Sequence, residues 1–102
     1  MDKKYAIDIT KKFSEEIRKL FPIEKVVLFG SFVKGTNNKW SDIDIAVIVN
    51  KSNFDFFEAY RKLGNVSLKL DARIETIIID KTKDFSGFLN MISKEGIVVF
   101  TK

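Results

Sequence analysis

The sequence predicts an α/β or α+β sandwich, in which short strands alternate with amphipathic helices. Two observations support this fold class. Apolar residues recur every three or four positions over residues 8–20 and 84–94, as they do on one face of a helix. Between these segments lie short apolar runs rich in β-branched residues, which favour strands. The expected order is helix, strand, loop, strand, helix, strand, helix, strand.

The first half of the chain is expected to form one helix and two strands. The helix over residues 8–20 stops at Pro22, because proline cannot continue it. A strand follows at residues 26–29, and residues 35–38 are typical of a loop. The second strand covers residues 42–49. One of its faces is apolar throughout, whereas the other begins with two aspartates and then becomes apolar, as in a strand that runs from a core into a cleft.

Two helices and two strands are expected in the second half. The first helix opens with a cap that pairs Ser52 with Asp55, and Gly64 ends it. The expected bounds are 52–63 and 84–94 for the helices, and 68–79 and 97–100 for the strands.

Composition narrows the possible chemistry. The 102 residues include neither cysteine nor histidine, which removes disulfides, thiol chemistry, the usual general base and the usual zinc ligand. No apolar run approaches the roughly 20 residues that cross a bilayer, and the N-terminus lacks the apolar core of a signal peptide. We therefore expect a single cytoplasmic domain, residues 1–102, with no membrane partner.

The basic residues are scattered along the chain. The net charge of +4 arises from 15 lysines and three arginines that occur in ones and twos, without a dense basic block. Such a balance permits a polyanionic partner but does not require one. Nucleic acid is therefore not expected as a partner, and a nucleic-acid-binding module is the weakest of the functions considered.

Asp42 and Asp44 form the first part of a candidate site. Residues two positions apart on a strand point to the same side and lie roughly 6–7 Å apart. Two such carboxylates can hold one divalent cation, or bridge two that are about 4 Å apart, whereas without a cation they would repel each other. Because the ligands are all oxygens, the expected cofactor is Mg²⁺, or else Mn²⁺, sharing its coordination shell with substrate phosphates.

Gly30 and Ser31 offer a place for those phosphates. Glycine lets the backbone turn sharply and approach a ligand closely, while backbone N–H groups and the serine hydroxyl can donate to phosphate oxygens. Lys34 lies one turn further on if the segment is helical, and would add a positive charge.

The pattern of Gly30-Ser31, ten residues, then Asp42-x-Asp44 resembles the signature of the DNA polymerase beta nucleotidyltransferase superfamily. The segments GSFVKG and WSDIDIAVIV are more closely similar to its minimal nucleotidyltransferase branch. Val33 stands where that branch usually has alanine, and Lys34 where it often has arginine. The resemblance covers about residues 24–100. It implies the nucleotidyltransferase fold, a small mixed sheet with helices packed mainly on one side.

The resemblance also implies an activity. Gly30, Ser31 and Lys34 would bind a nucleoside triphosphate, with ATP favoured, and Asp42 and Asp44 would bind the metal ions. The enzyme would transfer a nucleoside monophosphate, AMP, to an acceptor hydroxyl. Minimal nucleotidyltransferases typically accompany a small helical HEPN protein in toxin–antitoxin pairs and adenylylate that toxin, so an antitoxin role is implied. The alternative is an inactive subunit that regulates a partner by binding alone; the intact motif argues against it.

A third carboxylate is expected to complete one metal site and to help deprotonate the acceptor. The strand predicted over residues 68–79 places Asp71, Arg73 and Glu75 on one face. Asp71 and Glu75 would then lie roughly 13 Å apart along the strand, so that only one of them can serve. The segment DAR is similar to the Asp-x-Arg strand of the polymerase beta group and favours Asp71. Glu75, in the segment IET, is the alternative.

Overall fold

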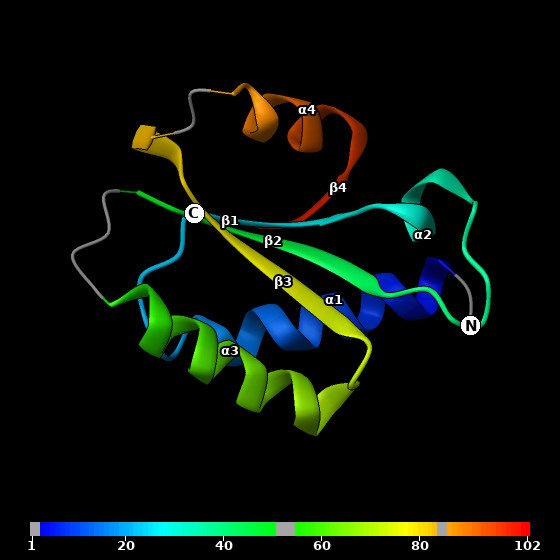
Figure 1. The fold of residues 1–102 in the computed structure, drawn as a ribbon, viewed down its shortest axis with the longest axis horizontal. Helices are drawn as coiled ribbons and strands as arrows, with labels where there is room; N and C mark the ends of the chain where they lie inside the picture. Colours follow the sequence, from blue (N-terminus) through cyan, green and yellow to red (C-terminus); the bar gives the residue numbers. More distant parts are fainter. Residues whose placement is uncertain (1–2, 51–54, 84–85) are drawn as a thin grey trace.

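A four-stranded mixed sheet forms the centre of the computed structural model, which describes residues 3–50, 55–83 and 86–102 (Figure 1). The strand order is β3-β2-β1-β4; β1 is antiparallel to both of its neighbours, and β2 and β3 are parallel. The strands are β1 (Lys25–Phe29), β2 (Ile43–Val49), β3 (Ile74–Asp80) and β4 (Ile97–Thr101). The predicted small mixed sheet is confirmed.

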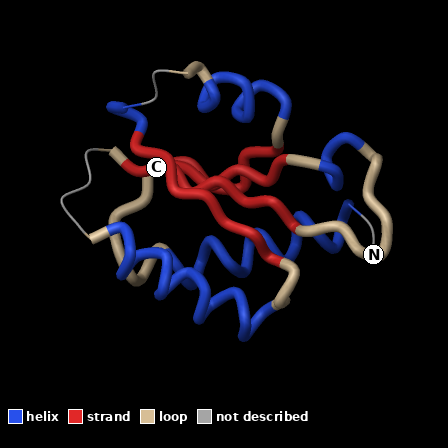
Figure 2. Tube along the Cα trace, in the orientation of Figure 1, coloured by secondary structure: helices blue, strands red, loops and turns tan. Residues whose placement is uncertain are grey.

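Helices cover both faces of the sheet, with the two long ones on the same side (Figures 1 and 2). The elements are α1 (Lys3–Ile17), α2 (Ser31–Lys34), α3 (Phe56–Leu70), α4 (Phe88–Glu95) and the 3₁₀-helix η1 (Lys81–Lys83). Helices α1 and α3 pack on one face, and α4 packs on the other. The expectation of helices mainly on one side is confirmed, with α4 as the helix on the second face. No helix in the described ranges is long and apolar enough to cross a membrane.

Strand β2 separates two apolar cores. Ile43, Ile45 and Val47 belong to the larger core beneath α1 and α3. Ala46 and Ile48 point the other way, into the smaller core beneath α4. This alternation is the period-two geometry of a strand that is covered on both sides. Asp44 is the one residue of β2 that is not fully buried, and it lies on the α4 face.

Helix α3 differs most from the prediction, because it continues through Gly64 to Leu70. Glycine inside a helix costs about 1 kcal/mol relative to alanine. Ser67 is buried beyond Gly64, and Val66 and Leu70 pack against the larger core. Burial of this apolar side offsets the low helix propensity of Gly64, so the predicted helix end is wrong.

The other boundaries shift by a few residues. Helix α1 begins at Lys3 rather than at residue 8 and ends at Ile17. Asp55 caps α3 by accepting a hydrogen bond from the Phe57 N–H, whereas Ser52 lies outside the described residues. Helix α4 is described from Phe88 onward; the predicted start at residue 84 also lies outside the described residues.

Candidate functional site

Asp44 lies at the centre of the candidate site. In the sheet it is paired with Phe29 of β1 on one side and with Glu75 of β3 on the other. Gly30 follows β1 with a φ of +83°, and a Cβ added there would lie 2.2 Å from the Asp44 Oδ2 atom. The carboxylate therefore fills the space that any side chain at position 30 would need, and only glycine fits.

The carboxylates around Asp44 form a cluster of like charge. Burial raises the pKa of Asp44 above its ordinary value, and the negative charges of Asp42 and Glu75 raise it further. Asp42 precedes β2 and is exposed, as is Glu75. Such a cluster favours either a proton or a cation.

The cluster fits a hard divalent ion that also binds a substrate. Within residues 3–50, 55–83 and 86–102, no three His, Cys, Asp or Glu side chains are gathered closely enough to hold a metal ion by themselves. Mg²⁺ is usually held by one or two carboxylates together with water and substrate phosphates rather than by a complete protein cage. The oxygen donors of Asp42 and Asp44 match that coordination chemistry.

Helix α2 places the other predicted residues beside Asp44. It begins at Ser31 directly after Gly30, whose carbonyl accepts hydrogen bonds from the N–H groups of Val33 and Lys34, both at 3.1 Å. Phe32 is almost fully buried and anchors the turn in the larger core. Ser31 is half-buried and Lys34 is exposed, so both retain access to solvent. Residues 31–34 thus form the helical turn on which the expected position of Lys34 depended.

Asp71 occupies a different environment from the one predicted. It follows the last residue of α3 and caps that helix, since β3 begins only at Ile74. The Tyr5 hydroxyl donates to its Oδ2 atom at 2.9 Å. Arg73 donates from Nε to Oδ1 at 3.0 Å and from Nη2 to Oδ2 at 2.7 Å. These hydrogen bonds, with that of Arg73 first, lower the pKa of Asp71 to about 2.

The predicted strand carrying Asp71, Arg73 and Glu75 on one face is therefore wrong. The physical reason is the extension of α3, which takes up the residues from 68 to 70. Glu75 alone of the three lies within β3, and its partner in the parallel register is Asp44.

A family comparison agrees with this geometry. The model of the nucleotidyltransferase domain matches residues 10–99, nearly the whole chain. The chain belongs to the nucleotidyltransferase domain family. The protein is thus a nucleotidyltransferase, as the Gly30-Ser31 and Asp42-x-Asp44 pattern indicated.

This nucleotidyltransferase is similar to a curated protein and to solved structures. The chain is 29% identical over 99 residues to a Methanocaldococcus jannaschii protein named "Putative protein adenylyltransferase MJ0141", covering 91% of this chain and 97% of the relative. A crystal structure of a "putative nucleotidyltransferase" from Sulfolobus solfataricus superposes with a TM-score of 0.68 at 22% identity, covering 98% of this chain and 84% of that one.

A second similar crystal structure is described as a toxin–antitoxin with AMP-PNP. It has a TM-score of 0.62 at 23% identity, and the match covers 90% of this chain and 73% of that one. At such identities the two crystal structures establish the fold that this nucleotidyltransferase shares with them.

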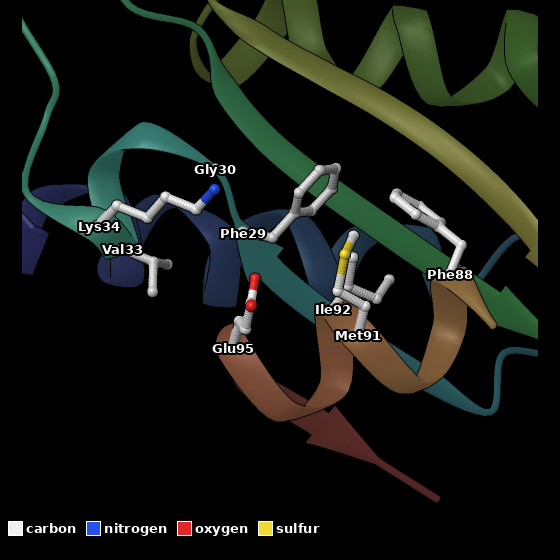
Figure 3. A pocket seen from close by; sticks show the side chains of 8 residues that line it. All are labelled: Phe29, Gly30, Val33, Lys34, Phe88, Met91, Ile92 and Glu95. Atoms are coloured by element: carbon white, nitrogen blue, oxygen red, sulfur yellow. The ribbon is translucent and has the colours of Figure 1, made fainter.

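The nucleotidyltransferase also has a pocket of about 220 Å³ on the α4 face, next to Gly30 (Figure 3). We call it the α4 pocket. Its wall is formed by Phe29 and Gly30 after β1, by Val33 and Lys34 of α2, and by four residues of α4. Sequence reasoning missed it, because the apolar spacing of the last helix predicted a core face or a face for a partner.

Proposed function

We propose that this nucleotidyltransferase transfers AMP from ATP to a hydroxyl group on a partner protein, with Mg²⁺ or Mn²⁺ as cofactor. The observation that carries the proposal is the position of the Asp44 carboxylate, which occupies the space a Cβ at position 30 would need, while Asp44 is paired with Glu75 in the sheet. The name of the M. jannaschii relative, a protein adenylyltransferase, supports AMP as the transferred group and a protein as the acceptor.

In the proposed site, Asp42 and Asp44 hold the divalent ion and Gly30, Ser31 and Lys34 position the triphosphate. The ion, when bound, neutralises the charge on the reacting and departing phosphate oxygens. Gly30 permits close approach of the backbone, Ser31 supplies a hydroxyl donor, and Lys34 supplies a positive charge. Most of the rate enhancement then comes from positioning and charge neutralisation.

Glu75 replaces Asp71 as the third carboxylate in this proposal. Glu75 is paired with Asp44 and lies close enough for its charge to raise the pKa of that residue. Both Asp71 oxygens already accept hydrogen bonds from Arg73. Glu75 would accept the proton of the acceptor hydroxyl as its oxygen bonds to the α-phosphorus and the bond to pyrophosphate breaks.

The proposed acceptor is a small helical HEPN-type protein, and the proposed role is that of a cytoplasmic antitoxin. This part rests on kinship with minimal nucleotidyltransferases. It is also consistent with the similar structure, which is described as a toxin–antitoxin with AMP-PNP.

The test compares four variants: Asp44→Asn, Glu75→Gln, Asp71→Asn and, as a control, Asp8→Asn, which removes an exposed carboxylate of α1. Each is incubated with ATP, Mg²⁺ and the protein encoded by the adjacent gene, and the acceptor is weighed by intact-mass spectrometry. We expect Asp44→Asn and Glu75→Gln to slow transfer by about 10²-fold or more. Asp71→Asn and Asp8→Asn should retain transfer at a temperature at which circular dichroism shows them folded.

Two results would change the proposal. Glu75→Gln could keep full activity while folded Asp71→Asn loses it. That result would show that Asp71, and not Glu75, is the third carboxylate. Tight binding of the partner without a mass shift, for any nucleoside triphosphate, would favour the alternative of a regulatory subunit that acts by contact.

A further inference from the structure

We infer that the α4 pocket binds the nucleobase of the nucleoside triphosphate. The inference rests on the proposed function, since it takes the triphosphate to lie at Gly30 and Ser31. The proposed function assigns the motif residues to the phosphates and the metal ion. The inference adds a binding site for the base.

The position of the pocket is the first argument. Gly30 forms part of its wall, and a Cβ added at Gly30 would clash with the Asp44 carboxylate. Phe29, another wall residue, is the sheet partner of Asp44. The pocket therefore lies beside Asp44, which in the proposed function holds the divalent ion that the phosphates share. A nucleotide bound there can extend its sugar and base into the pocket without crossing another element.

The size of the pocket limits the ligand to one ring system. Its volume of about 220 Å³ is below the roughly 300–1,000 Å³ of pockets that enclose drug-sized molecules. A nucleobase is of suitable size, whereas a complete nucleoside triphosphate is not. The phosphates must then remain outside the pocket, toward Ser31, which is not part of its wall.

The lining of the pocket suits a flat aromatic ligand. The rings of Phe29 and Phe88 meet edge to face, with centroids 6.1 Å apart and an angle of 88° between their planes. Ile92 is buried beneath them, and Met91 is about half exposed at the rim. Aromatic rings and methionine sulfur both make favourable contacts with π-systems, and bases stack on such side chains regardless of sequence.

The charged residues of the pocket wall indicate that the base, and not the phosphates, occupies the pocket. Lys34 and Glu95 extend their side chains toward the cavity from α2 and α4 (Figure 3). Neither makes an ion pair with any other residue that the structure describes. Glu95 would repel a phosphate group but can accept a hydrogen bond from an N–H group of a base. Lys34, in the wall of the pocket, can contact the phosphates that lie outside it.

The acceptor is a less suitable occupant. In an in-line displacement the attacking hydroxyl and the departing pyrophosphate lie on opposite sides of the phosphorus. With the triphosphate at Gly30 and Ser31, the hydroxyl must come from the β3 side, where Glu75 lies. The α4 pocket lies on the Gly30 side of Asp44, away from that approach.

Binding measurements without any acceptor test the inference. Calorimetry in Mg²⁺ compares AMP-PNP with inorganic tripolyphosphate, which lacks the base and sugar. We expect the wild-type protein to bind AMP-PNP roughly 5- to 150-fold more tightly, the range typical of one stacked base. Met91→Trp, which fills the pocket, should remove most of this difference and leave tripolyphosphate binding unchanged. The control Asn90→Trp alters the neighbouring exposed residue of α4, outside the pocket, and should preserve the difference.

Photolabelling gives a second measurement that needs no substitution. Wild-type protein irradiated with 8-azido-ATP should carry the label on the peptide that contains residues 88–95. A label confined to other peptides, or an AMP-PNP affinity that Met91→Trp leaves intact, would overturn the inference while AMP transfer still proceeds. Labelling at residues 88–95 without transfer to any acceptor would instead contradict the proposed function alone.

Discussion

At the level of single residues, the site depends on the absence of a side chain at position 30. Gly30 adopts φ +83° and ψ −153°, a conformation that is essentially restricted to glycine. The same residue leaves room for the Asp44 carboxylate, which would otherwise meet a Cβ. One glycine thus serves the turn from β1 into α2 and the close approach of a proposed metal ligand.

Replacement of this glycine should damage both stability and activity. We expect Gly30→Ala to lower the free energy of unfolding by about 1–3 kcal/mol, because alanine is strained in this conformation. It should also displace Asp44 and abolish most transfer. Urea denaturation and the mass-based transfer assay measure the two effects.

Gly35→Ala is the matched control for that prediction. Gly35 also has a positive φ, +77°, but an added Cβ would meet nothing within 4 Å. The variant Gly35→Ala should therefore lose stability through backbone strain alone, and the folded variant should keep its activity. Equal activity in the two variants would show that the contact between position 30 and Asp44 does not matter.

At the level of elements, α3 decides which residues are available to the sheet. Its last turn continues past Gly64 because Ser67 is buried and Leu70 packs on the core. This continuation delays the start of β3 until Ile74 and places Asp71 at the end of a helix. The choice of Glu75 as the proposed third carboxylate therefore follows from the length of a helix on the opposite face of the sheet.

Gly64 offers a direct test of helix α3. Since the residue lies within the helix and an added Cβ would meet nothing within 4 Å, Gly64→Ala should raise the free energy of unfolding by about 0.5–1 kcal/mol. Gly87→Ala has the same open surroundings but a φ of +77°, so it should be destabilising. Chemical denaturation of both variants checks the signs; a loss of stability in Gly64→Ala would argue against a helix through residue 64.

At the level of the whole molecule, the cluster around Asp71 connects three elements. Tyr5 belongs to α1, Asp71 ends α3, and Arg73 lies just before β3, where its carbonyl accepts a hydrogen bond from the Ile43 N–H. The Asp71 side chain is only 8% exposed, whereas that of Arg73 is 39% exposed. We therefore regard the cluster as a structural tie between both long helices and the sheet.

The cluster should make stability depend on pH in the acid range. The folded state lowers the pKa of Asp71 from 3.8 to about 2. The charged Asp71 therefore contributes its full stabilisation of the folded state at pH values above the pKa of the unfolded state. This contribution is lost as the pH falls through the pKa of the folded state. At pH 7, Asp71→Asn should cost about 1–2 kcal/mol, a value reduced by the exposure of Arg73.

Urea denaturation of the wild type and Asp71→Asn at pH 7, 4 and 2.5 measures this effect. The difference in the free energy of unfolding between wild type and Asp71→Asn should shrink as the pH falls from about 4 toward 2. Tyr5→Phe, which removes one donor and no charged group, serves as the control and should cost less. A difference that stays constant over this range would show that the charge of Asp71 is not its cause.

Much of the fold and half of the site could be predicted from local patterns. The strand at residues 42–49 was recognisable because β-branched residues fill it and because its two faces differ. The Asp42–Asp44 pair needs only the two-residue period of a strand, and the Gly30–Ser31 turn needs only glycine after an apolar run. These features are determined within a few residues along the chain, so the sequence by itself sufficed for them and for the family resemblance.

The remaining features depended on contacts between segments that are distant in sequence. Packing on the larger core, not local propensity, extended α3 through Gly64. The parallel register of β2 and β3 then brought Glu75, rather than Asp71, beside Asp44. The α4 pocket likewise exists only because α4 packs across β1 next to α2. Local propensities differ by about 1 kcal/mol per residue, whereas burial of one large apolar side chain contributes about 1.5–3 kcal/mol. Tertiary packing therefore decided that Glu75 lies beside Asp44 and that the α4 pocket forms.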